Sequence, residues 1–225
     1  MADGGPVIAE HLSPNRGARR NGLTPSLVVL HYTAMASAEA AVERLCDPRW
    51  EVSAHYLVAR DGRITRMVPE AERAWHAGAG EWMGQDDINS RSIGIELDND
   101  GVAPFSAPLM DALERLLADI LSRHGIAPQG VIGHSDMAPG RKHDPGPRFD
   151  WVRLARQGLA GNTDAPAQNA EDGVADVDAF RRAVHAIGYT AQVPDEVLLE
   201  AVRLRFAPWR RGPLSRADFD LSHNL

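Results

Sequence analysis

The sequence predicts an α/β protein, with a central mixed β-sheet covered by helices and a small helical domain at its C-terminal end. Short β-forming runs alternate with helical patterns over residues 1–160, as in a sheet packed against helices. Residues 161–173 (GNTDAPAQNAEDG) are small, polar and aperiodic, which is typical of a linker. Two amphipathic patterns follow it. We therefore expect one large domain over 1–160, a linker over 161–173 and a helical domain over 174–225.

Five runs of apolar and β-forming residues predict strands, at residues 26–33, 55–58, 64–68, 92–97 and 131–133. The first (SLVVLHYT) is apolar almost throughout, as a buried strand is. Asp61-Gly62 separates the second and third runs and favours a hairpin turn between them. The fourth (SIGIEL) alternates, so Glu96 should lie on the opposite face of the sheet from Ile95 and Leu97.

Three helices are expected in the same domain, at residues 37–45, 108–123 and 150–159. Ser37 can cap the first helix. The second carries Leu and Ile at helical spacing, with Pro108 at its start and Gly125 just past its end. The chain before residue 26 and the stretches 75–89 and 134–147 show no period and are expected to be irregular. In the C-terminal domain, residues 177–187 and 195–206 predict helices, and a third short segment begins near Ser215.

Composition excludes several classes of function. A net charge of -7 argues against nucleic acid as a partner, because neutralising phosphates requires a basic face. No apolar run is long enough to span a membrane. The first 20 residues lack the apolar core of a secretory signal, so we expect a cytoplasmic protein, or a periplasmic one if a signal was removed. A single cysteine, Cys46, excludes an internal disulfide, and a monomer is expected.

Two histidines and an aspartate occupy positions typical of functional groups in α/β proteins. His31 lies near the end of a predicted strand, His134 directly follows another, and Asp144 lies in the loop beyond. Two imidazoles and one carboxylate suit Zn²⁺ and leave a fourth position for water. Spacing alone leaves structural histidines as an equal alternative. Lys142, the only lysine among 24 Lys and Arg residues, stands two residues before Asp144.

Six ordered fragments strengthen the metal hypothesis: VVLHYTA (28–34), SAHYLVARDG (53–62), AWHAG (74–78), SIGIEL (92–97), IGHSD (132–136) and RKHDPGP (141–147). Together they resemble the bacterial N-acetylmuramoyl-L-alanine amidases of the AmpD and AmiD type, over about residues 25–155. The resemblance implies a zinc enzyme that hydrolyses the amide between N-acetylmuramic acid and L-alanine. Its partners would be peptidoglycan or muropeptide fragments, in cell-wall catabolism or recycling.

The resemblance also implies roles for individual residues. His31, His134 and Asp144 match the zinc ligands, Glu96 matches the general base, and Lys142 matches the residue that stabilises the developing oxyanion. His143 stands where many relatives have Thr or Ser, and we interpret it as a neutral variation.

Three further residues are candidates for binding substrate: His76, Asn89 and Arg91. Arg91 and Asn89 could bind substrate carboxylates and His76 the sugar or peptide. A packed loop histidine and a surface salt bridge are equally good interpretations of these positions.

Two other functions remain open: a muropeptide-binding protein without catalysis, and a zinc endopeptidase that cuts within the stem peptide. The C-terminal helices weakly resemble a small peptidoglycan-binding domain of some amidases, but the expected Asp-Gly turn is missing. They could equally be a packing appendage.

Overall fold

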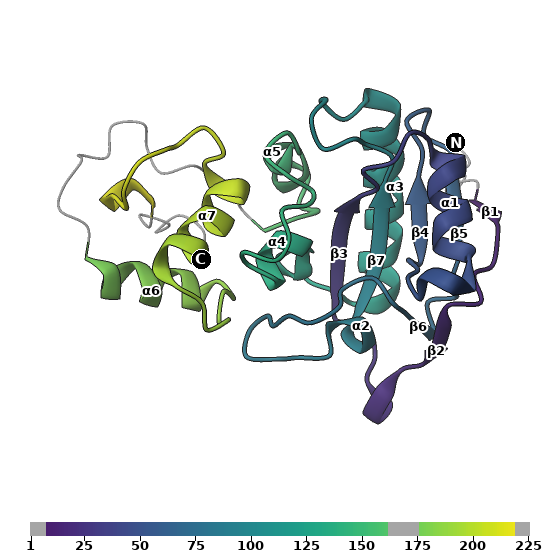
Figure 1. Cartoon of the computed structure of the whole chain (residues 1–225), viewed down its shortest axis with the longest axis horizontal. Helices are drawn as coiled ribbons and strands as arrows, with labels where there is room; N and C mark the ends of the chain where they lie inside the picture. The colour runs from purple at the N-terminus through teal and green to yellow at the C-terminus, as the bar shows by residue number, and fades with distance from the viewer. Residues whose placement is uncertain (1–7, 162–175, 219–225) are drawn as a thin grey trace.

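The computed structural model describes residues 8–161 and 176–218 (Figure 1). Its main sheet has the strand order β1-β5-β4-β7-β3-β8. The strands are β1 (Ile8–Glu10), β5 (Ile64–Arg66), β4 (Tyr56–Val58), β7 (Ser92–Leu97), β3 (Leu27–Tyr32) and β8 (Val131–Gly133). β4 and β5 are antiparallel, whereas the other neighbours are parallel, so the predicted mixed sheet is confirmed.

Three strands were not predicted. β1 and β2 (Arg16–Ala18) lie in the stretch expected to be irregular, and β6 (Glu72–Ala74) precedes the loop expected from residue 75. β2 and β6 form a separate antiparallel pair. Each of the three strands contains a charged residue and is partly exposed, so it lacks the apolar run by which the equally short β4 and β8 were predicted.

The long helices begin and end close to their expected bounds: α1 (Ala38–Cys46), α3 (Ala107–His124), α6 (Val177–Ala186) and α7 (Asp195–Phe206). The Ser37 side chain accepts a hydrogen bond from the N–H of Ala40 and so caps α1, and Gly125 ends α3 in the left-handed conformation. α5 (Trp151–Arg156) is shorter than expected. Two single-turn helices lie in stretches expected to be irregular. α2 (Ile88–Arg91) begins at the end of the loop 75–89, and α4 (His134–Met137) forms the start of the loop 134–147.

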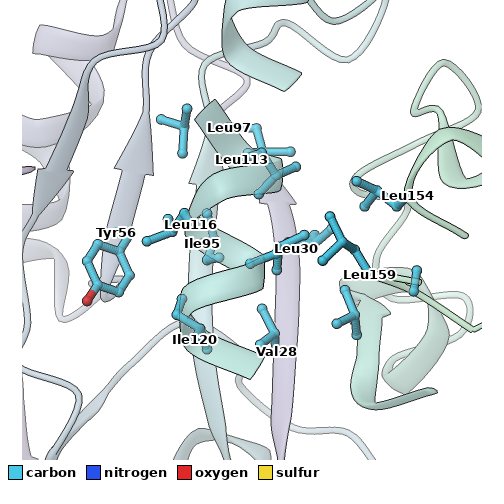
Figure 2. Close-up of a cluster of buried hydrophobic side chains, with 14 of the residues drawn as sticks. Val28, Leu30, Tyr56, Ile95, Leu97, Leu113, Leu116, Ile120, Leu154 and Leu159 are labelled. Carbon is cyan, nitrogen blue, oxygen red and sulfur yellow. The ribbon is translucent and has the colours of Figure 1, made fainter. Parts of the chain in front are cut away.

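The two faces of the sheet pack against different helices. α3 covers one face, where Leu113, Leu116 and Ile120 bury their side chains against β3 and β7 (Figure 2). Alternation in β3 sends Val28 and Leu30 to that face. On the opposite face, residues of β3 and β8 share a hydrophobic cluster with the C-terminal helices, which Figure 1 shows beside α4. His31 follows Val29 on this second face.

Within residues 8–161 and 176–218, no helix has the length and hydropathy needed to cross a membrane. The expected linker lies almost wholly outside the described residues, and the expected domain bounds remain predictions. Described residues of α6 and α7 nevertheless bury Phe180, Val184 and Leu198 together with residues of the sheet. The cytoplasmic location also remains a prediction from the sequence.

Candidate metal centre and active site

The three expected ligands meet at one edge of the sheet. His31 lies near the C-terminal end of β3, and His134 begins α4 directly after β8. Because β3 and β8 are parallel neighbours, their C-terminal ends lie side by side. The loop after α4 returns Asp144 to the same point, where its backbone carbonyl accepts a hydrogen bond from the N–H of Ser135.

Three potential ligand atoms face one another in this cluster. Nδ1 of His31 and Nδ1 of His134 are 2.9 Å apart, and Asp144 Oδ2 lies 2.9 Å from the first and 3.0 Å from the second. All three side chains are buried. The arrangement can hold a metal ion between two imidazoles and one carboxylate.

A chain of hydrogen bonds assigns the tautomer of His31. The carbonyl of Ile88 can only accept, so the Ser92 hydroxyl donates to it at 2.6 Å. Ser92 Oγ therefore accepts from Nε2–H of His76 at 3.1 Å, which leaves His76 Nδ1 as an acceptor. Nε2–H of His31 donates to that nitrogen at 3.0 Å, so Nδ1 of His31 presents a lone pair to the cluster.

His134 is oriented in the same sense. Its Nε2 lies 2.9 Å from the carbonyl oxygen of Ala77, which only accepts, and 3.3 Å from Nη2 of Arg141, which only donates. The shorter contact places the proton of His134 on Nε2. Nδ1 of His134 then presents its lone pair to the same point as Nδ1 of His31. Metal-binding histidines commonly donate their second N–H to a carbonyl or another acceptor in this way.

The charges of the cluster also suit a cation. Burial, followed by the nearby His134, lowers the pKa of His31 to about 4, so its imidazole is neutral at pH 7. Burial raises the pKa of Asp144, but its close polar contacts with His134 and His31 lower it by more, and the net pKa is far below its usual range. Two lone pairs and an anion at contact distance repel one another unless a cation lies among them. The residues therefore fit a divalent metal.

Glu96 stands beside this centre on the neighbouring strand. It pairs with His31 in the register of β3 and β7, and its Oε2 is buried without a hydrogen-bond partner in the described chain. Burial, and secondarily the charge of Asp144, raises the pKa of Glu96 well above its usual value, while Lys142 acts in the opposite direction. A carboxyl group in this setting binds a proton more readily than one in water.

Lys142 lies in the loop that carries Asp144. Its backbone N–H donates to the carbonyl of Ala138, which ties the start of this loop to α4. Its positive charge lowers the pKa of both Glu96 and His31, so the ammonium group lies within electrostatic range of both.

The three candidates for substrate binding have well-defined protein partners. His76 links His31 to Ser92, as described above. Asn89 Oδ1 accepts the backbone N–H groups of His76 and Ala77 at 3.0 and 2.8 Å, which fixes the loop around the centre. Arg91 donates from Nε to the carbonyl of Asp86. Substrate binding by these residues remains a prediction.

Sequence reasoning missed Ser92, Gly94 and the carbonyl of Ala77 as parts of the centre. A Cβ at Gly94 would lie 2.4 Å from Cγ of His76, so only glycine lets that ring rest against β7. Ala77 acts through its backbone, which the residue type does not reveal. The glycine in SIGIEL was the one available signal, because a glycine inside a strand often marks a close approach.

One hollow borders the predicted site, and a larger hollow lies among the C-terminal residues. One of about 370 Å³ has Glu96 in its wall and is otherwise lined by the loop after β3 and by α1, including Thr33, Met35 and Arg44. A larger one, of about 620 Å³, is formed mainly by C-terminal residues and includes none of the predicted site residues. The smaller hollow therefore lies beside Glu96, the residue expected to act as the general base.

Comparison with known proteins gives a family for this arrangement. Residues 21–147 match the family model Amidase_2, described as N-acetylmuramoyl-L-alanine amidase. The chain is 42% identical to N-acetylmuramoyl-L-alanine amidase AmiD of Escherichia coli K12, over 64% of this chain and 56% of that protein. It is 33% identical to the 1,6-anhydro-N-acetylmuramyl-L-alanine amidase AmpD of Enterobacter cloacae, over 68% of this chain and 92% of that protein.

Solved structures agree with the sequence comparison. The structure of AmiD from E. coli, in complex with anhydro-N-acetylmuramic acid-L-Ala-D-γ-Glu-L-Lys, has a TM-score of 0.79 and 33% identity, and the match covers 91% of this chain and 90% of AmiD. That of AmpDH3 from Pseudomonas aeruginosa, in complex with anhydromuramic pentapeptide, has a TM-score of 0.78 and 32% identity, with 93% and 94% covered.

Proposed function

This chain belongs to the N-acetylmuramoyl-L-alanine amidase family, and from that premise we propose that it is a zinc-dependent hydrolase of muropeptides. The bond cut is the amide between the lactyl carbonyl of N-acetylmuramic acid and the nitrogen of L-alanine. The observation that carries the metal dependence is the cluster of three lone-pair donors, His31 Nδ1, His134 Nδ1 and Asp144 Oδ2, at distances of 2.9 to 3.0 Å.

The substrate class follows from the relatives. AmiD and AmpDH3 were solved with anhydromuramic acid joined to peptides. We propose the same class of fragment for this chain, because the matches to both structures cover more than nine-tenths of it. The alignment of sequences spans only 56% of AmiD, so the full range of AmiD substrates does not transfer.

Zinc held by His31, His134 and Asp144 would polarise the scissile carbonyl and lower the pKa of a coordinated water to about 7. The protein contributes the remaining groups. Glu96 accepts a proton at Oε2, its unpartnered oxygen, and returns it to the departing nitrogen of L-alanine. Lys142 stabilises the negative charge that develops on the carbonyl oxygen. The proton comes from the water whose oxygen bonds to the carbonyl carbon. The C–N bond then breaks, leaving a carboxylate on the sugar and a free amine on the peptide.

Mass analysis of the products tests this proposal. Incubation with anhydro-N-acetylmuramic acid-L-Ala-D-γ-Glu-L-Lys should release the intact tripeptide and the free sugar. A zinc endopeptidase would instead give a shortened peptide, and a binding protein would return the substrate unchanged, so either result rejects the amidase assignment.

Variants separate metal binding from proton transfer. Replacing His31, His134 or Asp144 by Ala should abolish both zinc binding and turnover. Glu96→Ala and Lys142→Ala should retain zinc and lose most of the rate. Near-normal turnover of Glu96→Ala would contradict its role as the proton acceptor.

A further inference from the structure

A second buried carboxylate lies next to the metal centre and has no part in the proposed chemistry. Asp136 stands two residues after His134 in α4 and is 1% exposed. Its Oδ2 accepts the backbone N–H of Gly133 at 2.7 Å, which closes the turn that leads from β8 into His134. The position of the ligand therefore depends on how Asp136 itself is held.

The other partners of Asp136 come from the C-terminal helical region. Tyr189, between α6 and α7, donates its hydroxyl to Oδ1 at 2.5 Å. Arg205, near the end of α7, donates Nη1 to Oδ2 at 2.7 Å. Both side chains are buried, and they stand 53 and 69 residues from Asp136 in the sequence.

Arg205 is itself fixed by the catalytic region. Its guanidinium carbon lies 4.0 Å from the centre of the Trp151 ring, and Nη2 donates to the carbonyl of Val131 at 3.2 Å. Val131 begins β8, whereas Asp136 lies in α4. A single guanidinium thus joins the strand before His134 to the helix that contains it.

A buried carboxylate needs such partners, because an uncompensated charge is strongly disfavoured away from water. Without Arg205 and Tyr189, Asp136 would turn toward solvent and release the N–H of Gly133. The turn that presents His134 would then lose its internal support.

We propose that Tyr189 and Arg205 are positioning residues for the metal ligand His134 and act through Asp136, so that the C-terminal helices complete the metal centre. This inference rests on the proposed metal site. It gives these helices a role different from a wall-binding domain or a packing appendage. Groups that orient a ligand from outside the metal shell commonly change metal affinity or activity about 10- to 100-fold when they are removed.

The test uses the full chain and measures metal affinity directly. Tyr189→Phe removes only the hydroxyl and keeps the ring, which packs edge-on against Trp82 at 4.9 Å. Arg205→Met removes the charge, and Arg205→Lys restores a positive group. Zinc affinity is measured by competition with a chelating dye, and ligand geometry by the visible absorption spectrum of the Co²⁺-loaded protein.

A matched control lies on the same helix. Arg203 donates to the buried Asp218 at 2.7 Å and makes no contact with Asp136, so Arg203→Met breaks a comparable buried ion pair. We expect Arg203→Met to lower the melting temperature and leave both metal readouts unchanged. Arg205→Met should weaken zinc binding about 10- to 100-fold and alter the Co²⁺ spectrum, Tyr189→Phe should do so to a smaller extent, and Arg205→Lys should recover part of the loss.

The opposite pattern would overturn the proposal. If the variants of Tyr189 and Arg205 lower only the melting temperature, as Arg203→Met does, the contacts are merely structural. Should Arg205→Met fail to fold, Tyr189→Phe and Arg205→Lys carry the same comparison. A wild-type protein that binds zinc but releases no peptide would reject the amidase function while leaving this comparison of affinities intact.

Discussion

Replacing Gly94 by Ala tests whether the chain of hydrogen bonds behind His31 orients it for the metal. A Cβ at Gly94 would lie 2.4 Å from Cγ and 2.6 Å from Nδ1 of His76. Carbon atoms in contact prefer at least about 3.5 Å, so the ring must retreat by about 1 Å. β7 cannot yield instead, because it is paired with β3 on one side and β4 on the other.

The displacement acts on the 3.0 Å hydrogen bond between His31 Nε2 and His76 Nδ1. A bond lengthened to about 4 Å no longer counts as a hydrogen bond. Loss of such a partner typically lowers metal affinity about 10- to 100-fold, and we expect a loss in that range for Gly94→Ala. Competition with a chelating dye, followed by turnover at saturating zinc, measures it.

Gly62→Ala is the control. Gly62 lies in the turn between β4 and β5, and a Cβ there would lie 2.8 Å from the carbonyl oxygen of Pro108. Gly62→Ala should therefore destabilise the fold without changing metal affinity. If a folded Gly94→Ala protein binds zinc as tightly as wild type, the hydrogen-bond chain does not orient His31. Ser92→Ala, which interrupts the same chain without adding volume, serves if Gly94→Ala does not fold.

Three further results are expected. Glu96→Gln should bind zinc normally but lower kcat by about 10²- to 10⁴-fold, the usual contribution of a proton-transfer group; unchanged kcat would reject that role. Leu116→Ala, at a fully buried position of α3, should lower the free energy of unfolding by about 2–5 kcal/mol in urea titrations; a loss below about 1 kcal/mol would show that this core can collapse around the gap. Burial raises the pKa of Glu70, but hydrogen bonds with Arg123, His124 and others lower it to about 2, below its usual 4.5. This stabilisation is present above the unfolded pKa and is lost as pH falls from about 4.5 toward 2. Glu70→Gln should therefore lower the free energy of unfolding by at most about 3 kcal/mol at pH 7 and by nothing near pH 2. A loss independent of pH would show that the Glu70 carboxylate is not stabilised in this way.

Sequence patterns predicted the parts of the fold in which many residues share one period. The long helix α3 and strand β7 have the strongest patterns and were located to within a residue at each end. β1, β2 and β6 were missed, since they are partly exposed and lack the apolar run by which the equally short β4 and β8 were predicted. α5 ends three residues before its expected bound, because its C-cap forms at Gln157.

The candidate site shows the same limit. The expected ligands His31, His134 and Asp144 meet in the structure. The resemblance to the amidase family predicted all three from the sequence. The groups that orient them did not follow from the sequence. Ala77 acts through its carbonyl, and Arg205 acts from a helix far along the chain, so only the folded protein relates them to the metal ligands.

The most direct test of the account is a zinc titration of the metal-free protein with anhydro-N-acetylmuramic acid-L-Ala-D-γ-Glu-L-Lys as substrate. Release of the tripeptide should rise in proportion to added zinc, stop rising at one ion per chain, and be absent in His134→Ala at every zinc concentration. Full turnover by the metal-free protein, or by His134→Ala, would contradict the account.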